Sequence, residues 1–482
     1  MRNHVTRFLG YFAGLFVAAL ALWIDRTFGS PTIDQIRYHL YYAESAAMQM
    51  SQVFITTFLV EVLGVALALA AAASIAHAHL ERACSGWRAR LTRAAPHVVL
   101  SGGVMMLLLQ FSVFSYAAAR LEDDHFAPSY VAPASAALEE TGRRNLVLIY
   151  VESLEETYAD ASLFGADLLQ PLHALGGQQL PAYQQSPGAT WTIAAMVATQ
   201  CGVPLTVYSE GDVRHDGNAR TFLAGATCLG DILQARGYRN VFLEGAPLSF
   251  AGKGAFLRDH GYQERWGKEE WLAAGARPPG TPDPEMGGWG MFDDALLARA
   301  RDKLVALHAA GQPFNLTILT LDTHNPHGYR SPRCQATGEA GGAEAFEGIV
   351  RCTSQALASF VQFFRNQGYL KDTTLVILGD HLAVGNAVED TLRSASPRRV
   401  FNLFLGAEPF PARAGPVVSF DMFPTLLQAT GMQAVRGRLG LGRSAWMPDV
   451  PPAPWVRHPN LPALSASPGY RKLWEPADRP GD

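Results

Sequence analysis

The sequence carries little charge of either sign. Charged residues make up 17% of the 482 positions, the formal net charge is -4, and the arginines are scattered instead of forming a basic stripe. A nucleic-acid-binding protein needs such a stripe to meet the phosphates, so this composition argues against one. The chain also lacks an internal repeat, and it is too long for one ordinary compact domain.

Apolar residues are concentrated in the first quarter of the chain. Three runs are long enough to cross a bilayer, which takes about 20 apolar residues: Phe8–Ile24, Val53–Ala76 and Val98–Ala119. The first run could be read as a cleaved signal peptide, but its Ala-x-Ala pattern lies inside the apolar stretch instead of after it. We therefore expect residues 1–121 to form a membrane anchor of about three transmembrane helices.

The charges beside these runs predict an orientation. Four arginines lie between the second and third runs, and three acidic residues follow the third. They are Arg82, Arg88, Arg90 and Arg93, and then Glu122, Asp123 and Asp124. Since cytoplasmic loops carry the excess of basic residues, the amino terminus is expected inside and everything after about Leu121 outside.

Cysteine is scarce, and its distribution agrees with this orientation. One of the five cysteines, Cys84, lies in the expected cytoplasmic loop, and the other four lie in the outer part. An even number in an oxidising compartment indicates disulfides. Of the three possible pairings we favour Cys201 with Cys228 and Cys334 with Cys352, which close local loops; four free buried thiols are the alternative.

The outer part alternates strand-like and helical patterns. The strand candidates are Leu146–Val151, Val241–Leu243, Asn315–Leu321, Thr374–Leu378 and Val400–Leu405, and the helix candidates include Phe292–Ala309 and Ser354–Gln367. This alternation predicts an α/β domain at residues 144–445, with a mostly parallel sheet sandwiched by helices. A polar linker at 122–143 is expected before it, and after it a proline-rich tail at 446–482 that wraps the surface or is disordered.

Two of the strand candidates run directly into acidic residues. The stretch NLVLIYVESLEETY leads into Glu152, and TLVILGDH leads through Gly379 into Asp380 and His381. Ligands of such sheets gather beyond the carboxyl ends of the strands. Two acids and an imidazole there predict a divalent metal site, with Mn²⁺ favoured and Zn²⁺ or Mg²⁺ as alternatives. A helix cap or a surface ion pair is the competing interpretation for either acid alone.

The stretch GATWTIAAMVATQCG places Thr192 at the start of a short predicted helix. Unpaired N–H groups at a helix amino terminus are a natural seat for a phosphoryl oxygen. Thr192 could then act as a nucleophile, provided that a metal or a base activates its hydroxyl. The alternative is that Thr192 or Thr190 is a plain helix cap.

Two further stretches carry groups suited to a phosphorylated substrate. TLDTHNPHG follows a strand candidate and offers His324 and His327 for acid–base work or for binding phosphate. FAGKG offers Lys253 between two glycines. Histidines and lysines in exposed loops commonly have no such role, so both assignments compete with that simpler interpretation.

Six motifs occur in an order that is specific to one family. They are YVESLEETY, WTIAAMVATQCGVPL, CLGDILQARGYRN, FAGKGAFLRDHGY, LTLDTHNPHG and GDHLAVGN. From roughly Asn145 to Gly442 the chain resembles the phosphoglycerol transferase I family, which modifies osmoregulated periplasmic glucans. That family belongs to the lipoteichoic-acid-synthase-like branch of the sulfatase/alkaline phosphatase superfamily.

The resemblance implies a set of roles and a location. Glu152, Thr192, Asp380 and His381 would bind the metal, with Thr192 as nucleophile, and His324 and Lys253 would bind the substrate. It implies transfer of phosphoglycerol from phosphatidylglycerol in the bacterial inner membrane to a periplasmic glucan, through a covalent threonine intermediate and with release of diacylglycerol.

Two departures and two rival functions accompany the resemblance. Formylglycine-dependent sulfatases carry C-x-P-x-R or S-x-P-x-R, and CGVPL has neither that spacing nor the arginine, which argues against cleavage of sulfate esters. The chain is also shorter after the catalytic domain than in enterobacterial members, which leaves the glucan acceptor open. The rivals are a phosphoethanolamine transferase acting on lipid A or a glycan, and a catalytically idle glycan-binding membrane protein.

Overall fold

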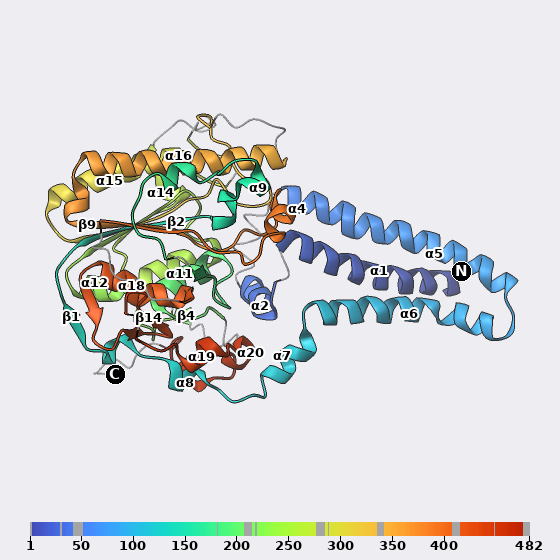
Figure 1. The fold of residues 1–482 in the computed structure, drawn as a ribbon. Coiled ribbons are helices and arrows are strands. Elements are labelled where there is room, and N and C mark those ends of the chain that lie inside the picture. Colours follow the sequence, from blue (N-terminus) through green and yellow to red (C-terminus); the bar gives the residue numbers. More distant parts are fainter. Residues whose placement is uncertain are drawn as a thin grey trace. The chain divides into compact units, whose positions relative to one another are not determined.

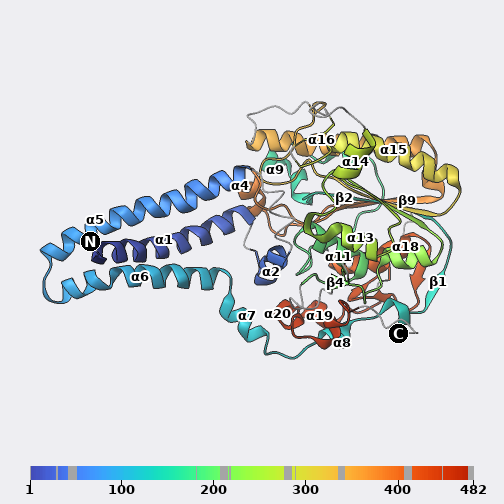
Figure 2. The same cartoon turned by 180° about the vertical axis from the view of Figure 1, so that it is seen from behind.

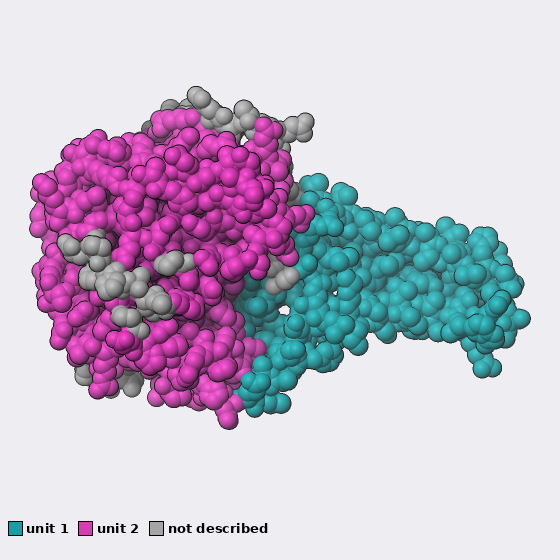
Figure 3. Space-filling view, viewed as in Figure 1, with its two compact units in different colours: residues 1–122 teal, residues 123–482 magenta. Residues whose placement is uncertain are grey.

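The structure is a computed structural model of the chain. It describes residues 2–28, 31–41, 52–180, 182–206, 215–216, 219–275, 285–287, 289–334, 342–406, 415–447 and 449–475. The chain divides into two compact units, residues 1–122 and 123–482, which Figure 3 shows in different colours. Each unit is described by itself.

The first unit is helical. Its elements are α1 (Arg2–Phe28), α2 (Ile33–Tyr41), α4 (Gln52–Thr57), the π-helix Phe58–Gly64, α5 (Val65–Ala83), α6 (Gly86–Gln110) and α7 (Val113–Ala119). Three helical stretches are long and apolar enough to cross a membrane: His4–Phe28, Ile55–Ala83 and Gly86–Gln110. The third differs from the predicted run Val98–Ala119, because the helix breaks at Phe111 and Ser112, where Ser112 has a φ of 50°.

Small residues and ion pairs hold these helices together. A Cβ on Gly103 would lie 2.2 Å from the carbonyl oxygen of Gly14, so α1 and α6 touch backbone to backbone. Arg7 pairs with Glu81 and Arg26 with Glu61, so the one charge within the second predicted run has a partner. Large apolar side chains such as Leu9, Ile75 and Leu109 point outward and are more than half exposed, as lipid-facing residues would be.

The second unit is built on a six-stranded sheet in the order β10-β9-β2-β8-β6-β7. The strands are β2 (Asn145–Val151), β6 (Arg239–Glu244), β7 (Glu264–Trp266), β8 (Phe314–Leu319), β9 (Thr373–Gly379) and β10 (Asn402–Leu405). All neighbours are parallel except β10, which pairs antiparallel with β9. The five predicted strands are confirmed with shifted ends, whereas the short edge strand β7 was not predicted.

Helices cover both faces of this sheet (Figures 1 and 2). One face carries α9 (Ala161–Phe164), α10 (Gln170–His173), α14 (Lys268–Gly275), α15 (Asp293–Ala310) and α16 (Ala343–Asn366), and the other carries α11 (Thr192–Cys201), α12 (Leu229–Ala235) and α18 (Met422–Ala429). The predicted helix Phe292–Ala309 matches α15, whereas α16 begins well before the predicted Ser354.

Strand β2 carries buried side chains on both faces, because helices cover both sides of the sheet. Val147 and Ile149 belong to the core formed with α15 and α16, and Tyr150 points the other way, where its hydroxyl lies 2.6 Å from that of Thr199 on α11. Every residue from Leu146 to Val151 is fully buried, as in a central strand of a parallel sheet. The predicted α/β sandwich is therefore confirmed.

The segments on either side of the predicted catalytic domain pack within the second unit. In the expected linker, β1 (Leu138–Glu140) pairs with β12 (Met432–Ala434), after α8 (Phe126–Ser129). In the expected tail, α19 (Pro454–Arg457), α20 (Leu461–Leu464) and α21 (Pro468–Arg471) bury Trp455, Tyr470 and Trp474. The described part of the tail, up to residue 475, is thus folded, and it lies in the same compact unit as the predicted catalytic domain.

The remaining elements of the second unit are short. They are β3 (Tyr183–Gln184), β4 (His215–Asp216), β5 (Ala219–Arg220), β11 (Val417–Val418), β13 (Arg438–Leu439), β14 (Gly442–Arg443), α13 (Lys253–Asp259) and α17 (Glu389–Arg393), with 3-10 turns at Pro133–Ser135, Glu156–Ala159, Phe250–Gly252, Tyr369–Lys371 and Ser419–Asp421.

Both favoured disulfide pairings, Cys201 with Cys228 and Cys334 with Cys352, are present.

Candidate active site

The two acids predicted as metal ligands follow neighbouring strands. Val151 at the end of β2 pairs with Gly379 at the end of β9, so Glu152 and Asp380 emerge side by side. His381 completes a buried cluster in which one ligand atom of each residue lies within 4.8 Å of the others. Both acids are buried, which excludes a surface ion pair, and neither caps a described helix.

The imidazole of His381 is oriented toward the two acids. Its Nδ1 lies 2.9 Å from the carbonyl oxygen of Leu382, which fixes the proton on Nδ1. Its Nε2 lies 3.6 Å from Oε1 of Glu152 and 3.5 Å from Oδ2 of Asp380. That Asp380 oxygen is buried and has no hydrogen-bond partner. A carboxylate oxygen without a hydrogen bond and the Nε2 of a neutral imidazole are suitable donors for a divalent cation.

Burial and mutual charge govern ionisation in this cluster. Burial, followed by the charge of Glu152, raises the pKa of Asp380 to about 7. Burial also raises the pKa of Glu152, but the charges of His324 and His381 outweigh it, and the net direction is downward. Burial lowers the pKa of His381, and the two acids more than offset this and raise it. A cation bound among these groups would favour the ionised form of both acids and the neutral form of His381.

Thr192 contacts this cluster from the start of a helix. It is the first residue of α11, and its hydroxyl donates to Oε2 of Glu152 over 3.3 Å. The helix cap is Trp191, and neither Thr190 nor Thr192 holds that position, so the interpretation of either as a plain cap is wrong. A half-buried hydroxyl at a helix amino terminus, next to a metal-type cluster, is placed to attack an electrophile bound there.

The predicted substrate-binding residues lie around the cluster. His324 follows β8, packs its ring against Trp289 at a centroid distance of 4.5 Å, and its charge acts on Glu152. His327 is exposed on the same loop. No described contact joins His324 or His327 to Thr192, so the structure brings His324 only into electrostatic range of the cluster.

Lys253 is part of a buried ion pair. Only 4% of it is exposed, and its Nζ lies 2.5 Å from Oε2 of Glu244, the last residue of β6. Burial raises the pKa of Glu244 to about 7 against the opposing attraction of Lys253. The ammonium also acts on Glu152, so the interpretation of Lys253 as a solvated loop lysine is wrong.

Several residues that shape the site were not predicted from the sequence. Glu244 follows a predicted strand just as Glu152 does, so the rule that found one acid could have found the other. Glu155 forms a buried ion pair with Arg398, and Oε2 of Glu155 accepts from the N–H of Ala383, which ties the loops after β2 and β9 together. Trp289 lies between glycines, which offered only a weak signal.

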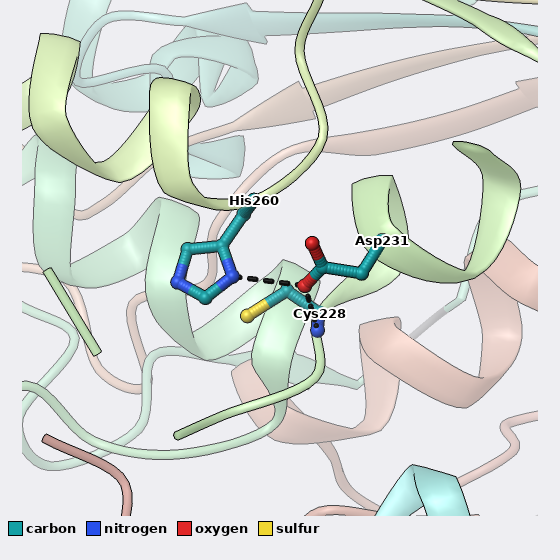
Figure 4. Close-up of side chains that lie close together, drawn as sticks. All are labelled: Cys228, Asp231 and His260. Carbon is teal, nitrogen blue, oxygen red and sulfur yellow. Dashed lines mark hydrogen bonds and ion pairs between the residues drawn. The ribbon is translucent and has the colours of Figure 1, made fainter. Parts of the chain in front are cut away.

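A second cluster of metal-type residues has a structural explanation. Figure 4 shows Cys228, Asp231 and His260 close together. The sulfur of Cys228 is bonded to Cys201, however, and one oxygen of Asp231 accepts both the N–H of Cys228 and Nδ1 of His260. Since Nε2 of His260 lies 3.0 Å from the carbonyl oxygen of Phe222, these groups fix the start of α12 and leave no free ligand set.

The chain is similar to known proteins over its second unit. The sulfatase family model matches residues 144–432. Phosphoglycerol transferase I of Xanthomonas euvesicatoria pv. vesicatoria is 39% identical over 325 residues, covering 64% of this chain and 44% of the relative. The protein of that name from Escherichia coli O127:H6 is 35% identical over 377 residues, covering 75% and 48%. The chain thus spans about half the length of these curated relatives.

The solved structures that the chain resembles include a lipoteichoic acid synthase and a periplasmic domain. The lipoteichoic acid synthase LtaP from Listeria monocytogenes has a TM-score of 0.48 at 14% identity, over 70% of this chain and 81% of that one. The zinc complex of the periplasmic domain of EcEptC from Escherichia coli has a TM-score of 0.45 at 14% identity, over 66% and 90%. Since the sulfatase model covers more than half of the sequence, the chain belongs to the sulfatase family.

Proposed function

We propose that this chain is a membrane-anchored phosphoglycerol transferase of the bacterial inner membrane, with its catalytic unit in the periplasm. The donor is phosphatidylglycerol and the acceptor is a hydroxyl of a periplasmic glucan. The observation that carries the proposal is the contact of Thr192 with Glu152 beside the buried Asp380–His381 pair. Relatives named phosphoglycerol transferase I, at 35–39% identity, support the choice of transferred group.

The chain's residues fit a divalent cation. Glu152, Asp380 and His381 would hold it together with the hydroxyl of Thr192, and Oδ2 of Asp380 would gain the partner that it lacks. When bound, such a cation would favour ionisation of the threonine hydroxyl and neutralise charge on the phosphate. Mn²⁺ is the favoured ion, since two carboxylates, a hydroxyl and one imidazole are predominantly oxygen ligands; Zn²⁺ and Mg²⁺ are the alternatives.

The reaction then consists of two balanced displacements. The Thr192 hydroxyl releases its proton as Oγ attacks the donor phosphorus, the bond from phosphorus to the diacylglycerol oxygen breaks, and that oxygen takes up one proton. A sugar hydroxyl next releases its proton as it attacks the phosphoglyceryl-threonine, the bond from phosphorus to Oγ breaks, and Oγ takes up one proton, which restores Thr192. His324 and Lys253 are proposed to hold phosphate oxygens in line for both steps, which is positioning and charge stabilisation.

Three long apolar helices give the proposal a physical setting. A lipid donor stays in the membrane, so an enzyme anchored by α1, α5 and α6 meets it without extracting it. The absence of the formylglycine motif in CGVPL removes the nucleophile that sulfate-ester cleavage uses in sulfatases of that type. Phosphoryl transfer by Thr192 is the chemistry that the remaining groups suit.

Donor choice tests the proposal. The purified full chain in detergent is mixed with phosphatidylglycerol or phosphatidylethanolamine, Mn²⁺ and no acceptor, and diacylglycerol is measured over time. We expect a burst of about one diacylglycerol per chain from phosphatidylglycerol alone. A burst from phosphatidylethanolamine alone would establish the rival transferase, and release from neither lipid with any of the three metals would support the non-enzymatic alternative.

A further inference from the structure

Ser153 has an unusual backbone conformation for a buried serine. Its φ of 52° lies in the left-handed region, and only 4% of the residue is exposed. A residue with a Cβ is strained there, and glycine would adopt the same φ more readily. Among the described non-glycine residues with positive φ, Ser153 is the one that directly follows a residue of the cluster.

The polar groups of Ser153 contact both carboxylates of the cluster. Its hydroxyl donates to Oε1 of Glu152 over 2.7 Å, and its backbone N–H donates to Oδ1 of Asp380 over 2.8 Å. Glu152 follows β2 and Asp380 follows β9, so one residue links the acids of two neighbouring strands. A glycine could supply the N–H but not the hydroxyl.

These two hydrogen bonds determine which oxygens stay available. With Oδ1 of Asp380 engaged by Ser153 and by the N–H of His381, Oδ2 is the oxygen left facing Nε2 of His381. With Oε1 of Glu152 engaged by the Ser153 hydroxyl, Oε2 is the oxygen that Thr192 contacts. Ser153 therefore fixes the rotation of both carboxylates.

Neighbouring threonines have a different task. Thr320 accepts the backbone N–H of Glu152, and Thr323 donates to its backbone carbonyl oxygen. They hold the main chain of Glu152 against β8 without touching either carboxylate. The rotation of the carboxylates is thus controlled separately from the position of the backbone.

We propose that Ser153 is a positioning residue whose hydroxyl increases the affinity of the Glu152–Asp380–His381 cluster for a divalent cation. The inference rests on the proposed function, because it takes this cluster to be the metal site. Residues that orient metal ligands commonly change metal affinity by about 10- to 100-fold when they are replaced. Serine occupies this position at φ 52°, although glycine would adopt that angle more readily.

Two variants separate the hydroxyl from the backbone strain. Ser153→Ala removes the hydroxyl and keeps the strained Cβ, whereas Ser153→Gly removes the hydroxyl and relieves the strain. Ser354→Ala is the matched control, since Ser354 is a fully buried serine whose hydroxyl bonds within α16 to the carbonyl oxygen of Val350.

The measurement is equilibrium binding of Mn²⁺ to the full chain in detergent, by calorimetry and by counting bound metal. We expect about one Mn²⁺ per wild-type chain, about 10- to 100-fold weaker binding in both Ser153 variants, and wild-type binding in Ser354→Ala. Wild-type affinity in either Ser153 variant would overturn the role of the hydroxyl while leaving the metal site intact. A wild-type chain that binds neither Mn²⁺ nor Zn²⁺ would overturn the metal site itself, and the role of Ser153 with it.

Discussion

The hydroxyl of Thr192 lies 3.3 Å from Oε2 of Glu152, which joins the first residue of α11 to the residue that follows β2. The two positions are 40 residues apart in the sequence. The proposed nucleophile begins a helix and the proposed ligand directly follows a strand, so both have rigid supports. This arrangement suits a reaction that depends on positioning around phosphorus.

Metal removal is expected to reduce both activity and stability. A cation that binds only the folded chain stabilises it by about 2.7 kcal/mol when present at 100 times its dissociation constant. Chelation followed by dialysis should therefore lower the melting temperature and stop diacylglycerol release, and Mn²⁺ should restore both. Asp380→Asn serves as the control, because its melting temperature should no longer respond to the chelator. Unchanged activity in a preparation shown by elemental analysis to be metal-free would refute the site.

Replacement of Lys253 is expected to weaken use of the lipid donor. Losing a charge-assisted contact to phosphate should raise KM for phosphatidylglycerol roughly 10-fold or more with a smaller change in kcat. The variant Lys253→Met should also unfold more easily, because Glu244 loses its ion-pair partner. The pKa of about 7 limits this loss, because Glu244 can take up a proton instead.

A matched lysine provides the control for that variant. Lys303 lies 2.5 Å from Glu264 and over the ring of Trp266, which resembles the setting of Lys253 between Glu244 and Phe250. Lys303→Met should lose stability without any change in KM. An unchanged KM in Lys253→Met would remove Lys253 from the substrate site.

The buried pair Asp293 and Asp322 predicts a pH dependence of stability. Burial raises the pKa of Asp293 to about 7. Burial also raises the pKa of Asp322, and the negative charge of Asp293 raises it further. The folded chain therefore keeps a proton that the unfolded chain has released above pH 4, so stability falls as the pH rises from about 4 to 7. The fall from one such group is at most on the order of 4 kcal/mol.

Asp293→Asn should flatten this profile. The amide oxygen can still accept the N–H groups of Leu321 and Asp322, which the Asp293 carboxylate accepts at 2.6 and 3.2 Å, but the side chain no longer titrates. Urea unfolding of both proteins at pH 5 and pH 8 measures the difference. If the variant loses as much stability between the two pH values as the wild type, the assignment of the retained proton to Asp293 is wrong.

The two disulfides are expected to be structural. Cys201–Cys228 joins the end of α11 to the residue before α12, and Cys334–Cys352 joins the loop after β8 to α16. Replacing either pair by alanines should cost about 2–5 kcal/mol of unfolding free energy. Melting curves of each double variant and of Cys84→Ala, the control thiol, check this. A wild-type curve that does not shift under reductant would show that the bonds do not contribute.

Much of the fold could be predicted because local patterns were strong. The central strand β2 has apolar residues on both faces, and that alone indicates a strand covered by helices on either side. Short or edge elements gave weaker signals: β7 has only half-buried residues, and the break at Ser112 interrupts an apolar run that otherwise reads as one helix. The folded tail was harder still, since its buried tryptophans are stabilised by contacts far away in the sequence.

Some residues of the candidate site could likewise be predicted from the sequence and others could not. Glu152, Asp380 and His381 follow apolar runs, so a rule about strand ends points to them. The start of a short predicted helix pointed to Thr192 as a possible nucleophile, and the resemblance to a family implies the same role. Ser153 could not be found in this manner, because its importance depends on a backbone angle and on two hydrogen bonds across neighbouring strands. The ion pair of Lys253 with Glu244 likewise depends on burial, which cannot be predicted from a glycine-rich sequence.

Covalent transfer to Thr192 is the central claim, and intact mass of the full chain tests it most directly. Wild type, Thr192→Ala and the control Thr190→Ala are incubated with phosphatidylglycerol and Mn²⁺ without an acceptor, and peptides are then mapped. We expect a phosphoglycerol adduct on Thr192 in the wild type and in Thr190→Ala, and none in Thr192→Ala, whose melting curve stays close to that of the wild type. An adduct on another residue, or full diacylglycerol release by Thr192→Ala, would contradict the account.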